Sequence, residues 1–259
     1  MTLPIYVVDA FADARFGGNP AAVCPLETWL PDQVLQNIAA ENNLSETAFF
    51  VRGEEGYDLR WFTPALEVDI CGHATLGSAY VISTYLDPDA RRMVFRTRSG
   101  ELVVTREGER LTLDFPAAPP QPVERAAEVE AALGIAPQAV LAAVKGMAVL
   151  ESEAQVLAAE PDLQKVAALP EDGLIITAPG EDCDFVSRYF APHAGIPEDP
   201  VTGSAHCVLT PYWAQRLGKT ELSARQVSRR GGSLTCSLAG DRVLISGRVV
   251  PYLEGVIHV

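Results

Sequence analysis

The stretch Glu198-Asp199-Pro200-Val201-Thr202-Gly203-Ser204-Ala205-His206 decides the fold, because a weaker copy, Glu67-Val68-Asp69-Ile70-Cys71-Gly72-His73-Ala74-Thr75, lies earlier in the chain. In both copies an acidic, extended run turns at a glycine and opens into an apolar segment typical of a helix. Each copy follows a matching tripeptide, Arg60-Trp61-Phe62 or Arg188-Tyr189-Phe190. The pattern indicates that the chain arose by duplication.

The spacing between the two copies is nearly constant. Phe62 and Phe190 are 128 positions apart, and Gly72 and Gly203 are 131 positions apart. An ordered series of matches at about half of the 259-residue length indicates two similar halves. The segment from Gly72 to Leu86 is apolar nearly all round, which is typical of a helix buried on every side. We therefore predict a central helix wrapped by a sheet.

The proline-rich run at residues 116–122 is the strongest break in the chain and is predicted to link the halves. The predicted domains are accordingly residues 1–117 and residues 118–251. Either length is sufficient to bury a hydrophobic core of its own.

Composition and charge restrict the class of partner. Acidic residues outnumber basic ones by 34 to 20, which gives a net charge of −14, and no block of basic residues occurs. This argues against nucleic acid or an anionic membrane surface as a partner. The first residues lack the pattern of a signal peptide, and no apolar run approaches about 20 residues, so we expect a cytoplasmic protein.

The cysteines and glycines exclude several classes of site. The five cysteines are odd in number and show no Cys-x-x-Cys spacing, which favours a reducing compartment and disfavours structural zinc. No Gly-x-Gly-x-x-Gly or Walker-type loop occurs, which disfavours a nucleotide enzyme. We predict neither a metal site nor a cofactor.

The repeated motif is suited to binding a small anion. A helix that starts at a glycine leaves backbone N–H groups unpaired and presents the positive end of its dipole. Two such starts facing one cleft would hold the carboxylate of a small acid. The alternative is that Asp199 and Thr202 are only N-caps and the glycines only turns. Two copies at matched positions favour the binding site.

The motifs resemble the PhzF-like family of phenazine biosynthesis, within the diaminopimelate epimerase-like superfamily. The matching pieces run in the family's order and cover nearly the whole chain. They are Asp9-Ala10-Phe11, Gly18-Asn19-Pro20-Ala21, Asn43-Leu44-Ser45-Glu46-Thr47-Ala48-Phe49, Arg60-Trp61-Phe62-Thr63-Pro64 and the two copies quoted above. The resemblance implies an α+β fold of two pseudo-symmetric domains, each a β-barrel-like sheet around a central helix. It also implies that residues 252–259 return to the first domain.

The same resemblance assigns roles to particular residues. Glu46 is expected to be the general acid/base, with Asp199 and His73 as further catalytic groups. Glu46 suits this task if the site removes it from water, whereas its alternative is a solvated loop carboxylate. His73 is expected to be neutral, because the positive end of a helix disfavours an imidazolium. The residues expected to contact substrate are Gly72, Gly203, Ser204, Cys71 and Thr202.

The reaction implied is a cofactor-independent isomerisation by proton transfer on a small cyclic or amino carboxylic acid. A dihydro-hydroxyanthranilate-like substrate is suggested, bound between the two domains, and a homodimer is left open. Racemases of the superfamily use two cysteines, but Thr202 stands where the partner of Cys71 would be. A one-sided reaction at Cys71, either epimerisation or dehydration of a hydroxyproline, stays open. So does a non-catalytic module that binds a metabolite.

Overall fold

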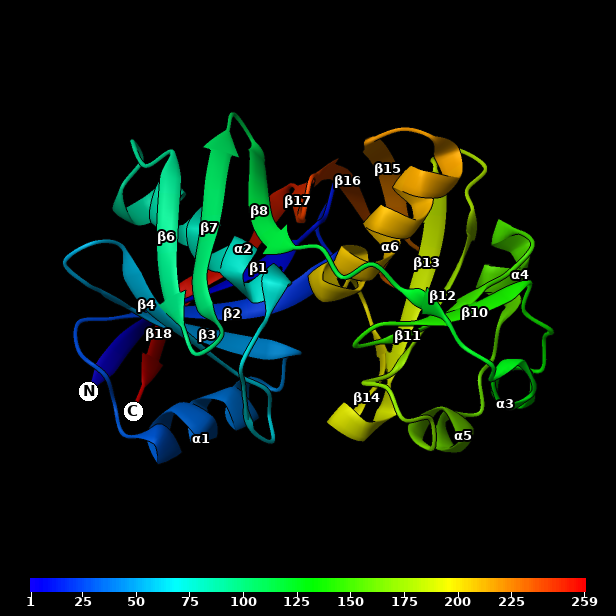
Figure 1. The fold of residues 1–259 in the computed structure, drawn as a ribbon. Coiled ribbons are helices and arrows are strands. Elements are labelled where there is room, and N and C mark those ends of the chain that lie inside the picture. Colours follow the sequence, from blue (N-terminus) through cyan, green and yellow to red (C-terminus); the bar gives the residue numbers. More distant parts are fainter. The chain divides into compact units, whose positions relative to one another are not determined.

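The computed structural model describes residues 1–259, apart from the side chain of residue 194. The chain forms two compact units (Figure 1). Unit 1 comprises Met1–Asp114 together with Ser246–Val259, and unit 2 comprises Phe115–Ile245. No helix in the described part of the chain is long and apolar enough to cross a membrane.

Unit 1 is a sheet built around one helix and covered outside by another. Its strands are β1 (Thr2–Ala10), β2 (Asn19–Leu26), β3 (Glu46–Arg52), β4 (Tyr57–Phe62), β5 (Glu67–Val68), β6 (Arg92–Thr97), β7 (Gly100–Glu107), β8 (Arg110–Pro116) and β18 (Val249–His258). Its helices are α1 (Asp32–Asn42), α2 (Gly72–Val81) and the π-helical turn η1 (Ile82–Leu86). Strand β18 pairs antiparallel with β1, from Ala10 opposite Val249 to Thr2 opposite His258.

Helix α2 is the centre of unit 1, as the sequence predicts. Every residue of α2 except Tyr80 is buried, and the helix lies against β1, β2, β3, β7 and β18. Helix α1 packs on the outer face of the sheet, where Leu35, Ile38 and Phe49 share a hydrophobic cluster. The predicted helix at residues 72–86 is present, with its last turn π-helical.

Unit 2 repeats this plan with more helices outside. Its strands are β9 (Gln121–Pro122), β10 (Ala139–Ala142), β11 (Gly146–Val149), β12 (Leu174–Pro179), β13 (Phe185–Ala191), β14 (Ile196–Asp199), β15 (Glu221–Gln226) and β16 (Gly232–Ala239). Strand β17 (Arg242–Gly247) contains the point where the chain returns to unit 1. The helices are α3 (Ala126–Leu133), α4 (Glu153–Ala158), α5 (Leu163–Ala167), the 3-10 turn η2 (Pro192–Ala194) and α6 (Gly203–Leu217).

Both units follow the same pairing order. In unit 1, β1 and β2 are antiparallel, β2 and β3 parallel, β3 and β4 antiparallel, β4 and β6 parallel, and β6 and β7 antiparallel. In unit 2, β10, β11, β12, β13, β15 and β16 repeat this series of pairs. The short strands β5 and β14 pair with β4 and β13 in turn. The predicted pair of similar halves is therefore confirmed.

Helix α6 of unit 2 runs through Pro211 without interruption. Proline has no N–H to donate to the carbonyl four residues earlier, which belongs to Cys207. That carbonyl instead accepts a hydrogen bond of 3.0 Å from the backbone N–H of Ala118. The proline-rich run predicted as a linker is thus fastened to α6 at the point where the helix lacks a donor.

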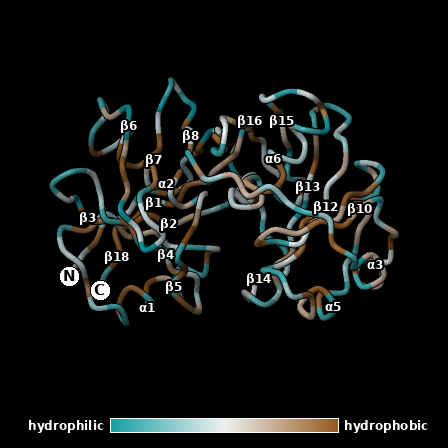
Figure 2. Tube along the Cα trace, in the orientation of Figure 1, coloured by the Kyte–Doolittle hydropathy of each residue, from teal (hydrophilic) through white to brown (hydrophobic). Residues whose placement is uncertain are grey.

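The core of each unit lies on both faces of its sheet. In unit 2, helices α3, α4 and α5 contribute Val129, Val156 and Val166 to a cluster on the outer face. The inner face receives α6, whose Trp213 stacks on Phe185. Figure 2 shows hydrophobic residues along the strands and hydrophilic ones at the turns of each unit.

Candidate functional site

Unit 1 brings three predicted site residues together at the start of α2. Glu46 is the first residue of β3 and lies opposite Ala21 of β2. His73 is the second residue of α2, and Cys71 immediately precedes the helix. We call Glu46, Cys71, His73 and the neighbouring Asn19 the Glu46 cluster. It forms because β3 and α2 meet at one end of the sheet.

Glu46 and His73 form a buried pair. Glu46 is 9% exposed and His73 is 4% exposed. Oε2 of Glu46 lies 3.1 Å from Nε2 of His73. Neither atom has a hydrogen bond of good geometry to any described residue. The alternative of a solvated loop carboxylate is therefore wrong for Glu46, whose carboxylate is buried beside a ring nitrogen of His73.

The other nitrogen of the His73 ring faces two different side chains. Sγ of Cys71 lies 3.5 Å from Nδ1, and Nδ2 of Asn19 lies 3.2 Å from it. A side-chain amide can present either its nitrogen or its oxygen to the ring, so Asn19 suits both protonation states of the imidazole. Asn19 belongs to the predicted Gly18-Asn19-Pro20-Ala21 motif, but no role had been expected for it.

The neighbours of His73 shift its pKa. Burial favours a neutral ring, but the nearby groups of Cys71 and Glu46 outweigh it and raise the pKa of His73 well above its ordinary value. The direction of this shift opposes the expectation of a neutral histidine, and the Glu46 carboxylate, whose Oε2 lies 3.1 Å from Nε2, is one of its causes. Burial, and then the charge of Glu46, raise the pKa of Cys71 to about 11.

The Glu46 cluster also offers metal-ligand atoms. One atom each from Glu46, Cys71 and His73 lies within 4.8 Å of the others. However, Glu46 faces Nε2 of the ring whereas Cys71 faces Nδ1. One ion can bind only one of these nitrogens, so the side chains do not converge as ligands of a tetrahedral site do. The arrangement fits a proton relay better than a metal centre.

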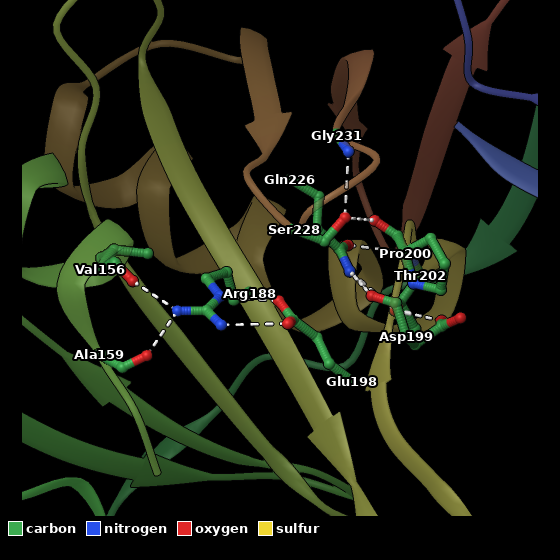
Figure 3. Close-up of polar contacts among 10 residues, drawn as sticks. All are labelled: Val156, Ala159, Arg188, Glu198, Asp199, Pro200, Thr202, Gln226, Ser228 and Gly231. Carbon is green, nitrogen blue, oxygen red and sulfur yellow. Dashed lines mark hydrogen bonds and ion pairs between the residues drawn. The ribbon is translucent and has the colours of Figure 1, made fainter. Parts of the chain in front are cut away.

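Unit 2 brings together the other predicted residues at the start of α6. Asp199 ends β14, where it lies opposite Tyr189 of β13. The Thr202 hydroxyl donates a hydrogen bond to Oδ2 of Asp199 (Figure 3). The Thr202 side chain makes no capping hydrogen bond to α6, so the alternative of a simple N-cap is wrong for Thr202. We call Asp199, Thr202 and the residues that bond them the Asp199 cluster.

Gly203 and Ser204 are the first two residues of α6. Gly203 is buried and Ser204 half-buried. The helix start thus lies beside the Asp199 carboxylate, as the repeated motif predicts. That one substrate contacts this cluster as well as the Glu46 cluster stays a prediction.

Each motif is held by an arginine of the matching tripeptide that precedes it, Arg60 or Arg188. Nε and Nη2 of Arg60 pair with the Glu67 carboxylate at 2.7 and 2.8 Å, and the same atoms of Arg188 pair with Glu198 at 2.7 and 3.0 Å. Arg188 also donates to the carbonyls of α4 and of the residue after it (Figure 3). The available signal for these two-pronged ion pairs was an arginine before each copy of the motif and a glutamate at its start.

Two further residues near Asp199 carried no sequence signal. Gln226, at the end of β15, is buried and bonds both Asp199 and Thr202. Lys145 lies 3.1 Å from the hydroxyl of Tyr189 and over its ring. Burial lowers the pKa of Lys145, whereas the charges of Asp172 and Asp199 oppose that change. Gln226 reaches the cluster from a strand and Lys145 from the turn between β10 and β11, and local sequence reveals neither approach.

The two units differ at the position of Glu46, the expected acid/base. Thr47 lies opposite Phe62 in unit 1, and Leu174 lies opposite Phe190 in unit 2, so Glu46 corresponds to Gly173. Gly173 has φ of 111°, and a Cβ there would lie 2.4 Å from the Phe190 carbonyl oxygen. Unit 2 therefore cannot carry a carboxylate at this position.

The chain is similar to known proteins over nearly its full length. Residues 8–255 match the model of the phenazine biosynthesis-like protein family. An uncharacterized isomerase of Pseudomonas aeruginosa is 53% identical over 258 residues, covering 100% of both chains. The crystal structure of a phenazine biosynthesis protein of the PhzF family from Enterococcus faecalis is 48% identical, with a TM-score of 0.98 over 100% of both chains.

A more distant structure shares only the fold. A hydroxyproline epimerase from Agrobacterium vitis is 11% identical, with a TM-score of 0.59 over 99% of this chain and 92% of that one. Together with the repeated pairing order, this likeness confirms the predicted epimerase-like fold class.

Proposed function

Because the chain belongs to the phenazine biosynthesis-like family of isomerases, we propose that it moves a proton between two carbon atoms of a small cyclic or amino carboxylic acid. Glu46 removes a proton from one carbon and becomes a carboxylic acid. The electron pair left behind shifts into the adjoining unsaturated system, and the proton is returned to another carbon. Substrate and product are isomers, and a single carboxyl group handles the proton, so the step requires no cofactor.

The buried pair of Glu46 and His73 is the observation that carries this proposal. The pair places a carboxylate that is buried from bulk water within 3.1 Å of an imidazole nitrogen. Each carboxylate oxygen has two lone pairs, so Glu46 can accept a proton from substrate while its Oε2 lies 3.1 Å from Nε2 of His73. The cluster thus supplies a base and leaves it able to accept a proton.

His73 supplies the charge that the reaction needs. Its neighbours raise its pKa well above the ordinary value, which favours the positively charged ring. When Glu46 takes the proton, the negative charge moves from Glu46 to the substrate, and the fixed imidazolium offsets it there. The first backbone N–H groups of α2, beginning at Gly72, are assigned to the carboxylate of the substrate.

The Cys71 reaction is the weaker candidate. A thiol with a pKa of about 11 carries little thiolate at neutral pH, and the thiolate is the form that removes a proton. The matched position in unit 2 holds Thr202, so the second cysteine of a two-base racemase is missing. The contact of Cys71 with Nδ1 of His73 instead suits a residue that orients the ring.

The proposal is tested by hydrogen exchange at carbon. The protein is incubated in D2O with a panel containing a dihydro-hydroxyanthranilate, proline, hydroxyproline and acyclic amino and hydroxy acids, and deuterium incorporation is followed by NMR and mass spectrometry. We expect incorporation into one class of acid, and we expect Glu46→Gln to reduce its rate by at least about a hundredfold. Glu41→Gln, at an exposed carboxylate of α1, is the control and retains the exchange.

The same variants distinguish the competing chemistry. Exchange that persists in Glu46→Gln but is lost in Cys71→Ala would show that the Cys71 thiol, and not Glu46, removes the proton. That result would overturn the assignment. Binding of one acid without any exchange in the unmodified protein would contradict the proton transfer itself.

A further inference from the structure

Gln226 makes an unusually complete set of contacts for a side-chain amide in unit 2. Its Nε2 donates to the backbone carbonyl of Asp199 at 2.8 Å and to the Thr202 hydroxyl at 3.1 Å. Its Oε1 accepts from the backbone N–H of Thr202 at 2.8 Å. Both ends of the amide are used, and the side chain is buried, so its orientation is fixed (Figure 3).

The amide gives the Thr202 hydroxyl a direction. Nε2 of Gln226 can only donate, so the oxygen of Thr202 accepts from it. The hydroxyl hydrogen then points elsewhere, and its partner is Oδ2 of Asp199. The bonds therefore run in one sense, from Gln226 to Thr202 to Asp199. This arrangement holds Oδ2 of the Asp199 carboxylate as an acceptor.

We call the series of hydrogen bonds from Gln226 to Thr202 to Asp199 the Gln226 relay. A different contact, from a serine, fastens the turn before the central helix in both units. Ser99 donates to the Asp69 carbonyl at 2.6 Å in unit 1, and Ser228 donates to the Pro200 carbonyl at 2.8 Å in unit 2. A serine thus closes the turn before the central helix in both units. Figure 3 shows the Ser228 contact beside Gln226.

The residue that corresponds to Gln226 in unit 1 is of a different kind. Strands β6 and β15 pair with β4 and β13 in matching registers, which places Gln226 at the position of Thr97. Thr97 bonds its own turn through the Gly100 carbonyl. The position of Asp199, opposite Tyr189, is occupied in unit 1 by Val68, opposite Trp61. The buried amide therefore occurs in the unit that has a carboxylate, and not a valine, at this strand position.

From these contacts we propose that Gln226 is a positioning residue, which orients the Asp199 carboxylate through the Thr202 hydroxyl for contact with the substrate. The orientation of Asp199 is a property of unit 2, whereas its consequence for turnover rests on the proposed function. The relay places a hydroxyl, directed by an amide, where the sequence pattern of a racemase would place a second cysteine.

The first test measures orientation without any substrate. Crystal structures are determined for the wild type, Gln226→Met and Thr202→Val, each of which preserves side-chain volume approximately while removing the relay. We expect the Asp199 carboxylate to leave its wild-type orientation, or to occupy several, in both variants. Thr202→Ser keeps the hydroxyl, and we expect it to restore the orientation. An unchanged Asp199 carboxylate in both Gln226→Met and Thr202→Val would overturn the proposal.

The second test measures turnover, with the panel acid that exchanges fastest in D2O as the probe. We expect Gln226→Met to lower kcat by roughly ten- to a hundredfold with little change in KM, because a small misplacement of a reacting group costs that much. In an Asp199→Asn background the same substitution should have almost no further effect. Gln138→Met, at an exposed glutamine of unit 2, is the control.

The outcomes separate the two proposals. A purely structural role of Gln226 would lower the temperature of unfolding but leave kcat per folded molecule intact, and the effects of Gln226→Met and Asp199→Asn would then be independent. Loss of exchange in Glu46→Gln with full activity in Gln226→Met would overturn the relay alone. Full exchange in Glu46→Gln would overturn the proposed function, while the crystal structures would still decide the relay.

Discussion

Two buried histidines at the starts of the central helices, His73 and His206, show how neighbours decide protonation. Both imidazoles lie in the interior, where burial alone disfavours the charged ring. His73 has a carboxylate 3.1 Å away, and its pKa is raised. Nδ1 of His206 has only the Thr202 carbonyl, at 2.8 Å, and burial lowers its pKa to about 4. His73 is thus equipped to carry charge, and His206 is a neutral part of the core.

The low pKa of His206 predicts a dependence of stability on pH. Between its ordinary value of about 6.5 and its folded value of about 4, the unfolded chain binds a proton that the folded chain does not. The free energy of unfolding should therefore fall as the pH falls through this range. For His206 alone, the loss between pH 7 and pH 5 should be about 2 kcal/mol.

This prediction is checked by urea unfolding at the two pH values in the wild type and in His206→Asn, whose amide can still donate to the Thr202 carbonyl. We expect the pH-dependent loss to be smaller in the variant by about 2 kcal/mol. Equal losses in both proteins would contradict the assignment of the effect to His206.

At the scale of the element, helix α2 owes its position to a glycine in its interior. Glycine disfavours a helix by about 1 kcal/mol relative to alanine. At Gly77, however, an added Cβ would lie 2.8 Å from Cγ2 of Val8 and 3.5 Å from Cγ2 of Val23. The absence of a side chain lets α2 approach β1 and β2 closely, and this approach helps to place His73 beside Glu46.

We therefore expect Gly77→Ala to destabilise the protein, by about 1–3 kcal/mol, because overpacking outweighs the gain in helix propensity. Val8 is β-branched and cannot easily turn its methyl group aside. Urea unfolding of the single variant and of the double variant with Val8→Ala measures the effect. The second substitution removes the clash, so the added alanine should then cost little or become favourable. A clear gain in stability from Gly77→Ala alone would contradict the predicted clash, because α2 would then accommodate the added methyl group without destabilising the protein.

At the scale of the whole molecule, unit 1 is assembled from two distant segments. Strand β18 covers β1 along nearly its whole length, and Ser246 lies beside Thr112, with 2.7 Å between their hydroxyl oxygens. The end of the first segment and the start of the second are therefore close. Residues 1–114 alone would leave the edge of β1 and part of the α2 surface uncovered.

We accordingly expect residues 1–114 to lack a cooperative unfolding transition, whereas the same residues joined by a short Gly/Ser linker to residues 246–259 should show one. Circular dichroism during urea unfolding tests both chains. Replacing the attached segment with a scrambled sequence of equal composition provides the control. Cooperative unfolding of residues 1–114 on their own would contradict the requirement for β18.

The duplicated plan also shows which residues the two units share and which candidate site residues only one unit has. The Arg60–Glu67 and Arg188–Glu198 pairs fasten the same turn in each unit, so they belong to the shared architecture. Glu46 corresponds to Gly173, whose backbone leaves no room for a side chain. The two copies have therefore kept one scaffold and specialised different positions on it.

The amino-acid sequence by itself determined the duplication, the central helices and the family, because these depend on periodic apolar residues and on motifs that are contiguous in the chain. It also pointed to Glu46, His73 and Asp199, each within such a motif. Only the tertiary structure decided the direction in which the pKa of His73 shifts and the partners of Asp199. Those depend on strand registers that bring Glu46 within 3.1 Å of His73 and Gln226 within 2.8 Å of the Asp199 carbonyl. Contacts across such distances in sequence leave no local pattern, since pairing and burial, not neighbours in the chain, create them.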